Sequence, residues 1–480
     1  MLSAEPQQRT ETDALAVASG AAVARIPVNW SAIAPAHPGP GFDPEDPGSP
    51  GYGFGLLDAA VRTAVAAGLE PLLVISHAPA FAEAPHRWPY AYAGSWDPDP
   101  EALGQFAAAV ARRYGGSYAP AGGSLPRVRL LQAWNEPNLA RYLEPQWIAA
   151  GGRWRAFSPL LYRSLLNAFY AAVKRTVPSD VVVSAGIAPN GDPAGVGRMA
   201  PITFLRALFC AGETLACADP AHFDVLAYHP LSVGNPDRVA RSSLDVSVAD
   251  AVKVQQLLRA AERHRTALPA GRKPLWVTEL NWESNPPASD GVRADLQAAW
   301  VSRALHRLWI AGVSLVCWQF LLDPRDGVLL ATDQGGTERE QRPAGLYEDT
   351  GTGASLGARA KPFATGFRLP FDPLRLSRGR VRVWALLPAS DATAVLQRKD
   401  RAGIWHEVAQ LDATPAAVVN KIVKLHGHAV LRLVVGGFLS SDASVGAGPW
   451  LKAKSAPHRA GAGGDGHHAP GRGRHRALRR

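Results

Sequence analysis

Two glutamates stand out because each follows a run of apolar residues. Glu136 lies in Trp-Asn-Glu-Pro (residues 134–137), and Glu279 lies in Val-Thr-Glu-Leu-Asn-Trp (residues 277–282). Two carboxyl groups that face one cleft can divide the cleavage of a glycosidic bond between them. One protonates the leaving oxygen, and the other attacks the anomeric carbon or activates water. The alternative is that both are ordinary glutamates at strand ends.

The elements that must position these glutamates repeat between residues 21 and 320. Short apolar runs there alternate with Ala- and Leu-rich stretches of helical period. Continuous apolar strands that alternate with helices predict a parallel sheet covered on both faces, and an α/β fold. In a barrel of parallel strands, the carboxyl ends meet at one face. The expected strands are residues 23–30, 69–77, 128–137, 181–190, 223–230, 274–282 and 313–320, and the expected helices include 56–67, 101–114, 160–176, 249–265 and 293–311.

The expected strands number seven, one fewer than a (β/α)8 barrel requires. Residues 12–19 read as a helix that leads directly into the strand at residues 23–30, and no strand precedes that helix. A barrel without its first strand would expose a sheet edge on each side of the gap. We therefore expect a first strand, and with it an export signal, upstream of Met1. The alternative is that residues 1–9 fill the gap irregularly.

The two glutamate motifs resemble those of glycoside hydrolase clan A, in which Asn-Glu-Pro and Thr-Glu lie three strands apart. The intervening Tyr-His-Pro (residues 228–230) is most similar to families 39 and 5 of that clan. The likeness covers roughly residues 21–371, and it implies a TIM barrel. It also implies that Glu136 is the acid/base and Glu279 the nucleophile. Their carboxyl groups would then lie about 5–5.5 Å apart, and configuration would be retained.

The resemblance implies a set of substrate-binding residues as well. Asn135 would hydrogen-bond the sugar 2-hydroxyl, while His229 and Arg25 would orient and support the nucleophile. Trp318 matches the aromatic floor on which the apolar face of a sugar stacks. The alternatives are a core histidine for His229, a surface position or a structural ion pair for Arg25, and a core tryptophan for Trp318. Further strand-end residues that could line the cleft or pack in the core are Trp30, His77, Asn190, Asn281 and Trp282.

Three cysteines in 480 residues exclude a scaffold built on disulfides. Cys210 and Cys217 could close a short loop by a disulfide, and two free thiols are the alternative. Cys317 is expected to be buried and inert. No Cys/His set has metal-ligand spacing, and neither a glycine-rich nucleotide loop nor a Gly-x-Ser-x-Gly elbow is visible. We therefore expect no metal and no cofactor.

The pattern changes after the barrel segment, which we place at residues 1–373. Strand-like runs then follow one another at residues 381–387, 394–398, 404–411, 421–425 and 429–435. Their spacing predicts a small β-sandwich of immunoglobulin or fibronectin III type over residues 374–447. Trp405 and Trp450 are too few for a sugar-stacking platform, so we expect a spacer or a unit that packs on the barrel.

Most of the net charge of +10 comes from residues 451–480, where eight Lys or Arg side chains stand against Asp465. We expect a disordered basic tail over residues 448–480, with at most a weak contact to an anionic surface. Nucleic-acid binding would depend on this tail alone and is not expected. No apolar run is long enough for a membrane span.

These observations together predict a retaining glycoside hydrolase whose partner is a carbohydrate, a β-linked glycan or glycoside. Endo and exo action both remain open. We expect a secreted or wall-associated protein by analogy with the fold, although no signal peptide is visible. The alternative is a catalytically silent carbohydrate-binding or wall-associated protein on a glycosidase barrel.

Overall fold

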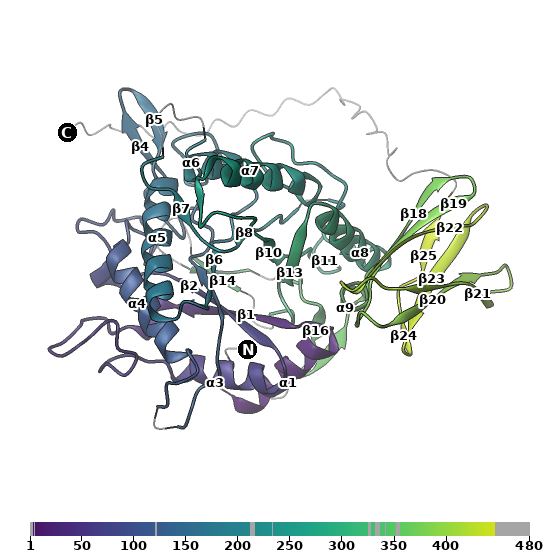
Figure 1. Cartoon of the computed structure of the whole chain (residues 1–480), viewed down its shortest axis with the longest axis horizontal. Helices are drawn as coiled ribbons and strands as arrows, with labels where there is room; N and C mark the ends of the chain where they lie inside the picture. The colour runs from purple at the N-terminus through teal and green to yellow at the C-terminus, as the bar shows by residue number, and fades with distance from the viewer. Residues whose placement is uncertain are drawn as a thin grey trace, which may run out of the picture.

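The computed structural model describes residues 3, 5–120, 122–211, 217–232, 234–324, 328–331, 337–340, 342–351 and 356–446. Seven parallel strands of the predicted α/β pattern form two sheets (Figure 1). The first sheet has the order β1 (Val23–Asn29), β2 (Glu70–Ser76), β3 (Leu130–Ala133) and β6 (Val181–Ser184), and the second has the order β13 (Val313–Trp318), β10 (Leu275–Leu280) and β8 (Leu226–Tyr228).

The two sheets meet on one side and stay open on the other. Two parallel bridges, Val183 to Val225 and Ile187 to Tyr228, connect β6 with β8. Within the described residues no backbone pairing joins β1 to β13, the strands at the opposite edges. The seven parallel strands expected from the sequence are therefore present, and within the described residues they do not form a closed ring. As predicted, a helix, α1 (Pro6–Ala18), leads directly into β1.

Helices surround these strands and cover their outer faces (Figure 1). The helix α4 begins where the Asp99 side chain accepts a hydrogen bond from the Glu101 N–H, with Pro100 in its first turn. Its buried face packs on α5, where a Cβ on Gly104 would come within 3.2 Å of the Ala168 carbonyl oxygen. The larger helices are α3 (Gly55–Ala66), α4 (Pro100–Arg113), α5 (Ser158–Thr176), α6 (Pro201–Leu208), α7 (Ala251–His264) and α8 (Ala294–Ile310), with α2 (Trp30–Ile33) and α9 (Pro362–Arg368) as short turns.

The loops between these elements contain short pairs of strands. The hairpin of β4 (Trp147–Ala150) and β5 (Arg153–Ala156) follows β3 and was not expected from the sequence. The other pairs are β7 (Ala221–His222) with β9 (Ala267–Leu268), β11 (Ser284–Asn285) with β12 (Val292–Arg293), β14 (Val328–Ala331) with β15 (Thr337–Glu340), and β16 (Tyr347–Asp349) with β17 (Ala358–Ala360).

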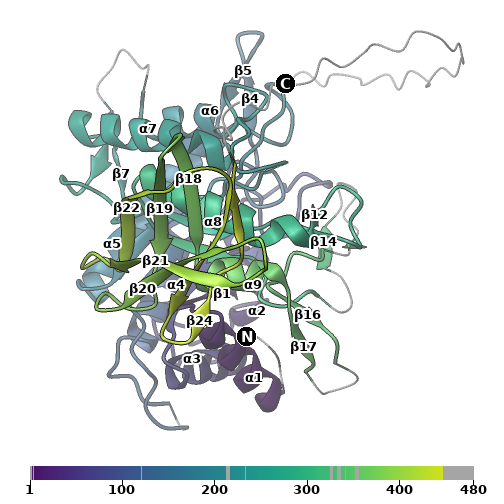
Figure 2. The same cartoon turned by 90° about the vertical axis from the view of Figure 1, so that its right-hand side faces the viewer.

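Residues 371–446, the β unit, lie beyond α8 and α9 at one end of the molecule (Figures 1 and 2). Two antiparallel sheets share a buried cluster that includes Val383, Leu396 and Leu431. The predicted boundary between residues 373 and 374 falls inside its first strand. One sheet contains β18 (Phe371–Ser377), β19 (Arg380–Leu386) and β22 (Val418–Lys424), and the other contains β21 (Trp405–Asp412), β20 (Thr393–Lys399), β23 (Ala429–Val435), β24 (Phe438–Leu439) and β25 (Ala443–Val445).

The β unit is anchored to α8 by a buried tryptophan and a shared aspartate. Trp384 belongs to the core of the first part of the molecule, which consists of the parallel strands and their helices. Its ring stacks on His306 with centroids 4.6 Å apart. The carboxylate of Asp372 accepts hydrogen bonds from His306 Nδ1 at 2.6 Å and from Arg303 Nη1 at 3.1 Å. The two parts of the described chain therefore share one apolar core at this junction.

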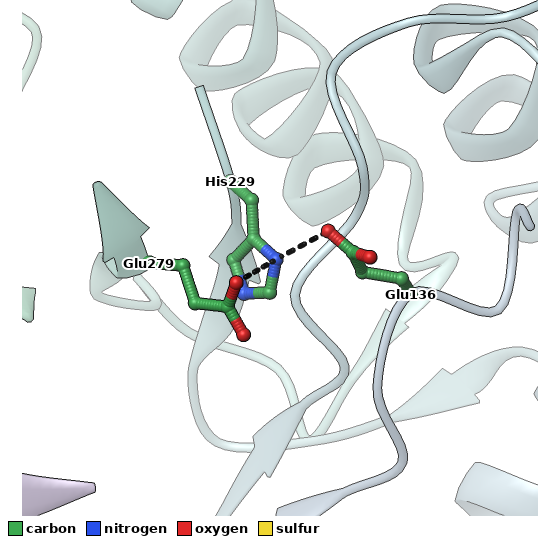
Figure 3. Close-up of side chains that lie close together, drawn as sticks. All are labelled: Glu136, His229 and Glu279. Carbon is green, nitrogen blue, oxygen red and sulfur yellow. Dashed lines mark hydrogen bonds and ion pairs between the residues drawn. The ribbon is translucent and has the colours of Figure 1, made fainter. Parts of the chain in front are cut away.

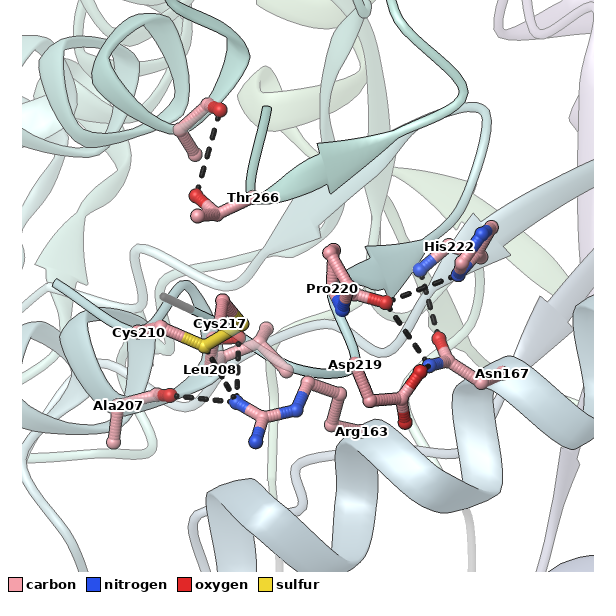
Figure 4. Close-up of a disulfide and its surroundings, with 11 residues drawn as sticks. Arg163, Asn167, Ala207, Leu208, Cys210, Cys217, Asp219, Pro220, His222 and Thr266 are labelled. Carbon is pink, nitrogen blue, oxygen red and sulfur yellow. Dashed lines mark hydrogen bonds between the residues drawn. A yellow bond between two sulfur atoms is a disulfide. The ribbon is translucent and has the colours of Figure 1, made fainter. Parts of the chain in front are cut away.

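Cys210 and Cys217 form a disulfide after α6, with their Cα atoms 5.7 Å apart (Figure 4). Arg163 of α5 donates to the nearby carbonyl oxygens of Ala207 and Leu208. Cys317 on β13 is a free thiol and is only partly buried as a residue, although burial of the thiol raises its pKa to about 12. No described helix is long and apolar enough to cross a membrane. The predicted basic tail lies outside the described residues.

Candidate active site

Glu136 and Glu279 lie on either side of His229 (Figure 3). They follow β3 and end β10 respectively, and both are almost buried, with 8% and 6% of their surface exposed. His229 Nδ1 lies 2.9 Å from Glu136 Oε1 and 3.8 Å from Glu279 Oε2. One side-chain oxygen or nitrogen from each of the three residues lies within 4.8 Å of the other two. The structure thus brings together two carboxylates that are 143 positions apart in the sequence.

The backbone that carries Glu136 leaves the strand in an unusual conformation. Trp134 and Glu136 have φ angles of 75° and 38°, in the left-handed region that side chains with a Cβ rarely adopt. The Trp134 N–H donates to the Ile75 carbonyl at 2.8 Å, and the Glu136 N–H donates to the Gly186 carbonyl at 3.0 Å. Such conformations persist where the surroundings hold them, and they concentrate at functional sites.

Arg25 of β1 links Glu279 to Asn135. Its Nη1 lies 2.8 Å from Glu279 Oε1, and its Nη2 donates to Asn135 Oδ1 at 2.8 Å. A guanidinium at this distance stabilises the negative charge on Glu279. Because Asn135 Oδ1 accepts from Arg25, its amide hydrogens stay available to another partner.

A cavity of about 770 Å³ lies between β1 and β13. Its lining includes Asn135, which follows β3, and Glu279 near the end of β10. Trp318 contributes a half-buried indole, whose Nε1 donates to the Ala344 carbonyl at 2.9 Å. The Phe363 ring packs against it with centroids 5.1 Å apart, which fixes its orientation. Side chains that could meet a ligand in this cavity are Arg25, His77, Asn135, Tyr142, Glu279 and Trp318.

His77 and Tyr142 form the aromatic edge of the cavity, with centroids 5.5 Å apart. Burial lowers the pKa of His77, and the nearby Arg141 adds to that shift, so the ring is neutral at pH 7. Burial raises the pKa of Tyr142, and the charges of Glu136 and Glu279 raise it further. The Tyr142 hydroxyl therefore stays protonated, as a hydrogen-bond donor.

No protein-family model and no curated protein matches the sequence. Among solved structures, the chain is similar to a family 39 glycoside hydrolase from the gut symbiont Bacteroides cellulosilyticus WH2. The identity is 17%, the match covers 87% of this chain and 76% of that chain, and the TM-score is 0.50. The chain has the fold of a glycoside hydrolase. The resemblance to clan A is thereby confirmed at the level of the fold.

Two further structures show a similar but weaker match. A monomeric β-xylosidase from Caulobacter crescentus CB15 has 14% identity over 90% of this chain and 91% of that chain, with a TM-score of 0.47. A family 30 endoxylanase from Clostridium papyrosolvens C71 has 12% identity over 87% and 90%, with a TM-score of 0.41.

Five predicted substrate-binding residues lie outside the cavity lining, and His229 is one of them. Trp30 is only 1% exposed, because its ring stacks on Phe106 in the core. The Trp282 indole is buried and donates to the Gly234 carbonyl at 3.0 Å. The Asn281 side chain donates to Gln319 at 3.0 Å. Asn190 is exposed and lies outside the cavity. For Trp30 and Trp282, core packing is the correct explanation.

His229 lies near Glu279, as the sequence predicts, but its ring contacts Glu136 more closely. Its other nitrogen, Nε2, lies 2.9 Å from the Thr278 hydroxyl, which in turn accepts from Gln132. Sequence reasoning missed both partners. The signal for Gln132 was present, since it is the one polar residue of the strand sequence Leu-Leu-Gln-Ala.

Glu136, His229 and Glu279 are also the described side chains that could hold a metal ion. Both ring nitrogens of His229 already have partners, and Arg25 holds one Glu279 oxygen. A guanidinium in contact with a ligand carboxylate repels a divalent cation. The arrangement therefore suits proton transfer and nucleophilic attack better than metal binding.

Proposed function

We propose that the chain is a retaining glycoside hydrolase that cleaves a β-linked glycan or glycoside by double displacement. The observation that carries the proposal is the pair Glu136 and Glu279, which meet through His229 with side-chain atoms within 4.8 Å. Retaining enzymes hold their carboxyl groups about 5–5.5 Å apart, whereas inverting enzymes need about 6.5–9.5 Å to admit a water. With one oxygen of each carboxyl group within 4.8 Å of the other, the closest approach of the pair is shorter than the spacing that inverting enzymes need, which favours direct attack by a carboxylate.

In the first step, Glu136 gives its proton to the glycosidic oxygen while Glu279 attacks the anomeric carbon. The carbon–oxygen bond breaks, the alcohol leaves, and a glycosyl ester forms on Glu279. In the second step, the Glu136 carboxylate takes a proton from water, the resulting hydroxide attacks the anomeric carbon, and Glu279 is released. Arg25 holds Oε1 of Glu279, so Oε2 is the oxygen that attacks.

The division of labour follows from the partners of each carboxylate. Glu279 pairs with the permanent cation of Arg25, which suits a nucleophile that must stay ionised. The described hydrogen-bond partner of the Glu136 carboxyl is the ring of His229. No cation contacts the Glu136 carboxyl among the described residues, so we assign the acid/base role to Glu136.

The cavity next to Glu279 is the proposed sugar site. The free amide hydrogens of Asn135 suit a sugar hydroxyl beside the nucleophile. Trp318 offers an indole surface to the apolar face of the ring, and Tyr142 offers a hydroxyl donor. His77 is neutral, so it can hydrogen-bond a sugar hydroxyl without adding charge.

The test compares the wild type with Glu279→Gln on a panel of dinitrophenyl β-glycosides. These leaving groups need little acid assistance, so the assay reports on the nucleophile. We expect turnover of one sugar and a loss of about 10³-fold or more in the variant, which corresponds to about 4 kcal/mol of transition-state stabilisation. Glu144→Gln, a buried glutamate outside the cavity lining, is the matched control and should keep its activity.

Two results would contradict the proposal. One is no turnover of any sugar by the wild type, and the other is equal turnover by the wild type and Glu279→Gln. Sugar binding without turnover, measured by calorimetry, would favour a silent carbohydrate-binding protein instead.

A further inference from the structure

A buried chain of hydrogen bonds runs beneath the two glutamates, from Gln132 through Thr278 and His229 to Glu136. We propose that Gln132 and Thr278 are positioning residues that fix the His229 ring with its hydrogen on Nδ1. That N–H then points at the acid/base Glu136, not at the nucleophile. The acid/base role of Glu136 in this inference rests on the proposed function. The position of the hydrogen on His229 does not depend on it.

The first link is the orientation of the Gln132 amide, which is fully buried. Its Nε2 lies 2.9 Å from the Ser184 carbonyl oxygen, a group that can only accept. Its Oε1 lies 3.5 Å from Nε of Arg25, which can only donate. Both contacts require the same assignment of the amide oxygen and nitrogen. The atom that lies 3.2 Å from Thr278 Oγ1 is therefore Nε2, and it donates to that oxygen.

The second link is the Thr278 hydroxyl. Its partners among the described residues are Gln132 Nε2 and His229 Nε2, the latter at 2.9 Å. Gln132 Nε2 can only donate, so among these partners His229 Nε2 is the one that can accept the buried hydroxyl hydrogen of Thr278. A neutral imidazole with an accepting Nε2 carries its hydrogen on Nδ1.

The third link is the contact between that Nδ1–H and Glu136. Nδ1 lies 2.9 Å from Glu136 Oε1 but 3.8 Å from Glu279 Oε2, so the hydrogen bond goes to Glu136. Oε1 is thereby held, and Oε2 is left to carry the proton to the leaving oxygen. The same N–H stabilises the carboxylate that remains after the proton has left.

Gly186 allows the ring to take this position. A Cβ at Gly186 would lie 1.9 Å from His229 Nε2, and the Gly186 carbonyl accepts the Glu136 N–H. Gly186→Ala therefore pushes the ring away without removing any hydrogen-bonding group. This gives a second way to disturb the chain that is independent of Thr278.

The first test reads the tautomer directly and does not require activity. The protein is labelled with ¹⁵N-histidine, and the His229 ring signals among the 14 histidines are identified by their loss in His229→Gln. We expect the Nδ1–H tautomer in the wild type and in Thr278→Ser, and its loss in Thr278→Val. An Nε2–H tautomer in the wild type, or an unchanged ring in Thr278→Val, would overturn the inference.

The second test compares two leaving groups on the sugar identified by the dinitrophenyl panel. Thr278→Val should lower kcat/KM about tenfold or more on the methyl glycoside, which depends on acid catalysis, but less than about threefold on the dinitrophenyl glycoside. Thr278→Ser should restore both rates, and Gly186→Ala should reproduce the selective loss. Equal losses on both substrates would mean that the hydrogen-bond chain supports Glu279 or the stability of the fold. That result would contradict the inference.

Other charged or titratable groups also face this region, namely Arg25 on β1, Glu279 on β10, Cys317 on β13 and Tyr142 in the loop after Glu136. Thr278→Val leaves all of them in place. The leaving-group comparison is made at one pH, so their titration does not enter the ratio. A wild type without turnover would contradict the proposed function, whereas the tautomer measurement would still decide this inference.

Discussion

Arg25 connects the proposed nucleophile to its neighbour, because one guanidinium contacts both Glu279 and Asn135. Arg25→Lys keeps the charge but loses the planar fork that reaches two partners. We expect kcat/KM on dinitrophenyl glycosides to fall about 10²-fold. Arg129→Lys, an exposed arginine that contacts Glu70, is the control and should leave the rate unchanged. A rate of wild-type size in Arg25→Lys would show that charge alone suffices.

Glu136 is tested by supplying the missing group from solution. In Glu136→Ala, a dinitrophenyl glycoside should still form the glycosyl ester, whose hydrolysis then becomes slow because no base activates water. Azide needs no base, so it should restore turnover by about tenfold or more and give the β-glycosyl azide. The product is identified by NMR. Formation of the α-azide, or no effect of azide, would argue against this role for Glu136.

The two glutamates that the sequence singled out carry a local signal. Glu136 and Glu279 each end an apolar strand within a short motif, and the structure brings them together. Thr278 and Gln132 carry no such signal as a pair, since 146 positions separate them and their contact depends on how two strands face each other. The strand expected over residues 23–30 ends one residue earlier in the structure, and Trp30 begins the short helix α2, where its ring stacks on Phe106 in the core.

At the level of elements, the loop that follows β3 joins the loop that follows β2 through Glu144. Its Oε2 accepts from the Ser95 hydroxyl at 3.4 Å, and burial raises its pKa from 4.5 to about 7. The unfolded chain ionises at the ordinary value, so this carboxyl contributes its full stability below pH 4.5. That contribution is lost as the pH rises through about 7.

Glu144→Gln removes this ionisable group and keeps an oxygen that accepts from Ser95. The free energy of unfolding should therefore increase by up to about 3 kcal/mol at pH 8, with little change at pH 4. Urea denaturation at the two pH values measures the difference. Glu407→Gln, at an exposed position on β21, is the control and should show no pH-dependent effect. An equal effect of Glu144→Gln at both pH values would contradict burial as the cause.

The long elements followed from periodicity, whereas the short ones did not. The strands β2 and β10 and the helices α4, α5 and α8 lie within about two residues of their predicted ranges. The strands β4 and β5 have only four residues each, too few for a clear period. The strand β18 contains Pro373 and directly follows Pro370, and proline argues against a strand in sequence reasoning. Its position at a sheet edge, paired only with β19, explains why proline is tolerated there.

For the whole molecule, the sequence predicted two parts but not how they join. Trp384 was assigned to a strand of the second part, yet its side chain completes the core of the first. Successive side chains of β19 point to opposite faces, and Val381, Val383 and Ala385 fill the core of the β unit from the face that Trp384 does not share. The β unit thus keeps its own core and contributes Trp384 to the core of the first part.

This junction predicts that the two parts unfold together. Trp384→Ala removes a fully buried ring that stacks on His306, and the loss should cost about 3–5 kcal/mol. Because the cavity would open between α8 and the β unit, differential scanning calorimetry should show one transition at a lower temperature, not one unchanged and one shifted transition. Ile404→Ala, at an exposed position of the same unit, should leave the melting temperature unchanged. Two separate transitions in the wild type would mean that the shared core does not couple the parts, and the loss in Trp384→Ala should then appear in only one of them.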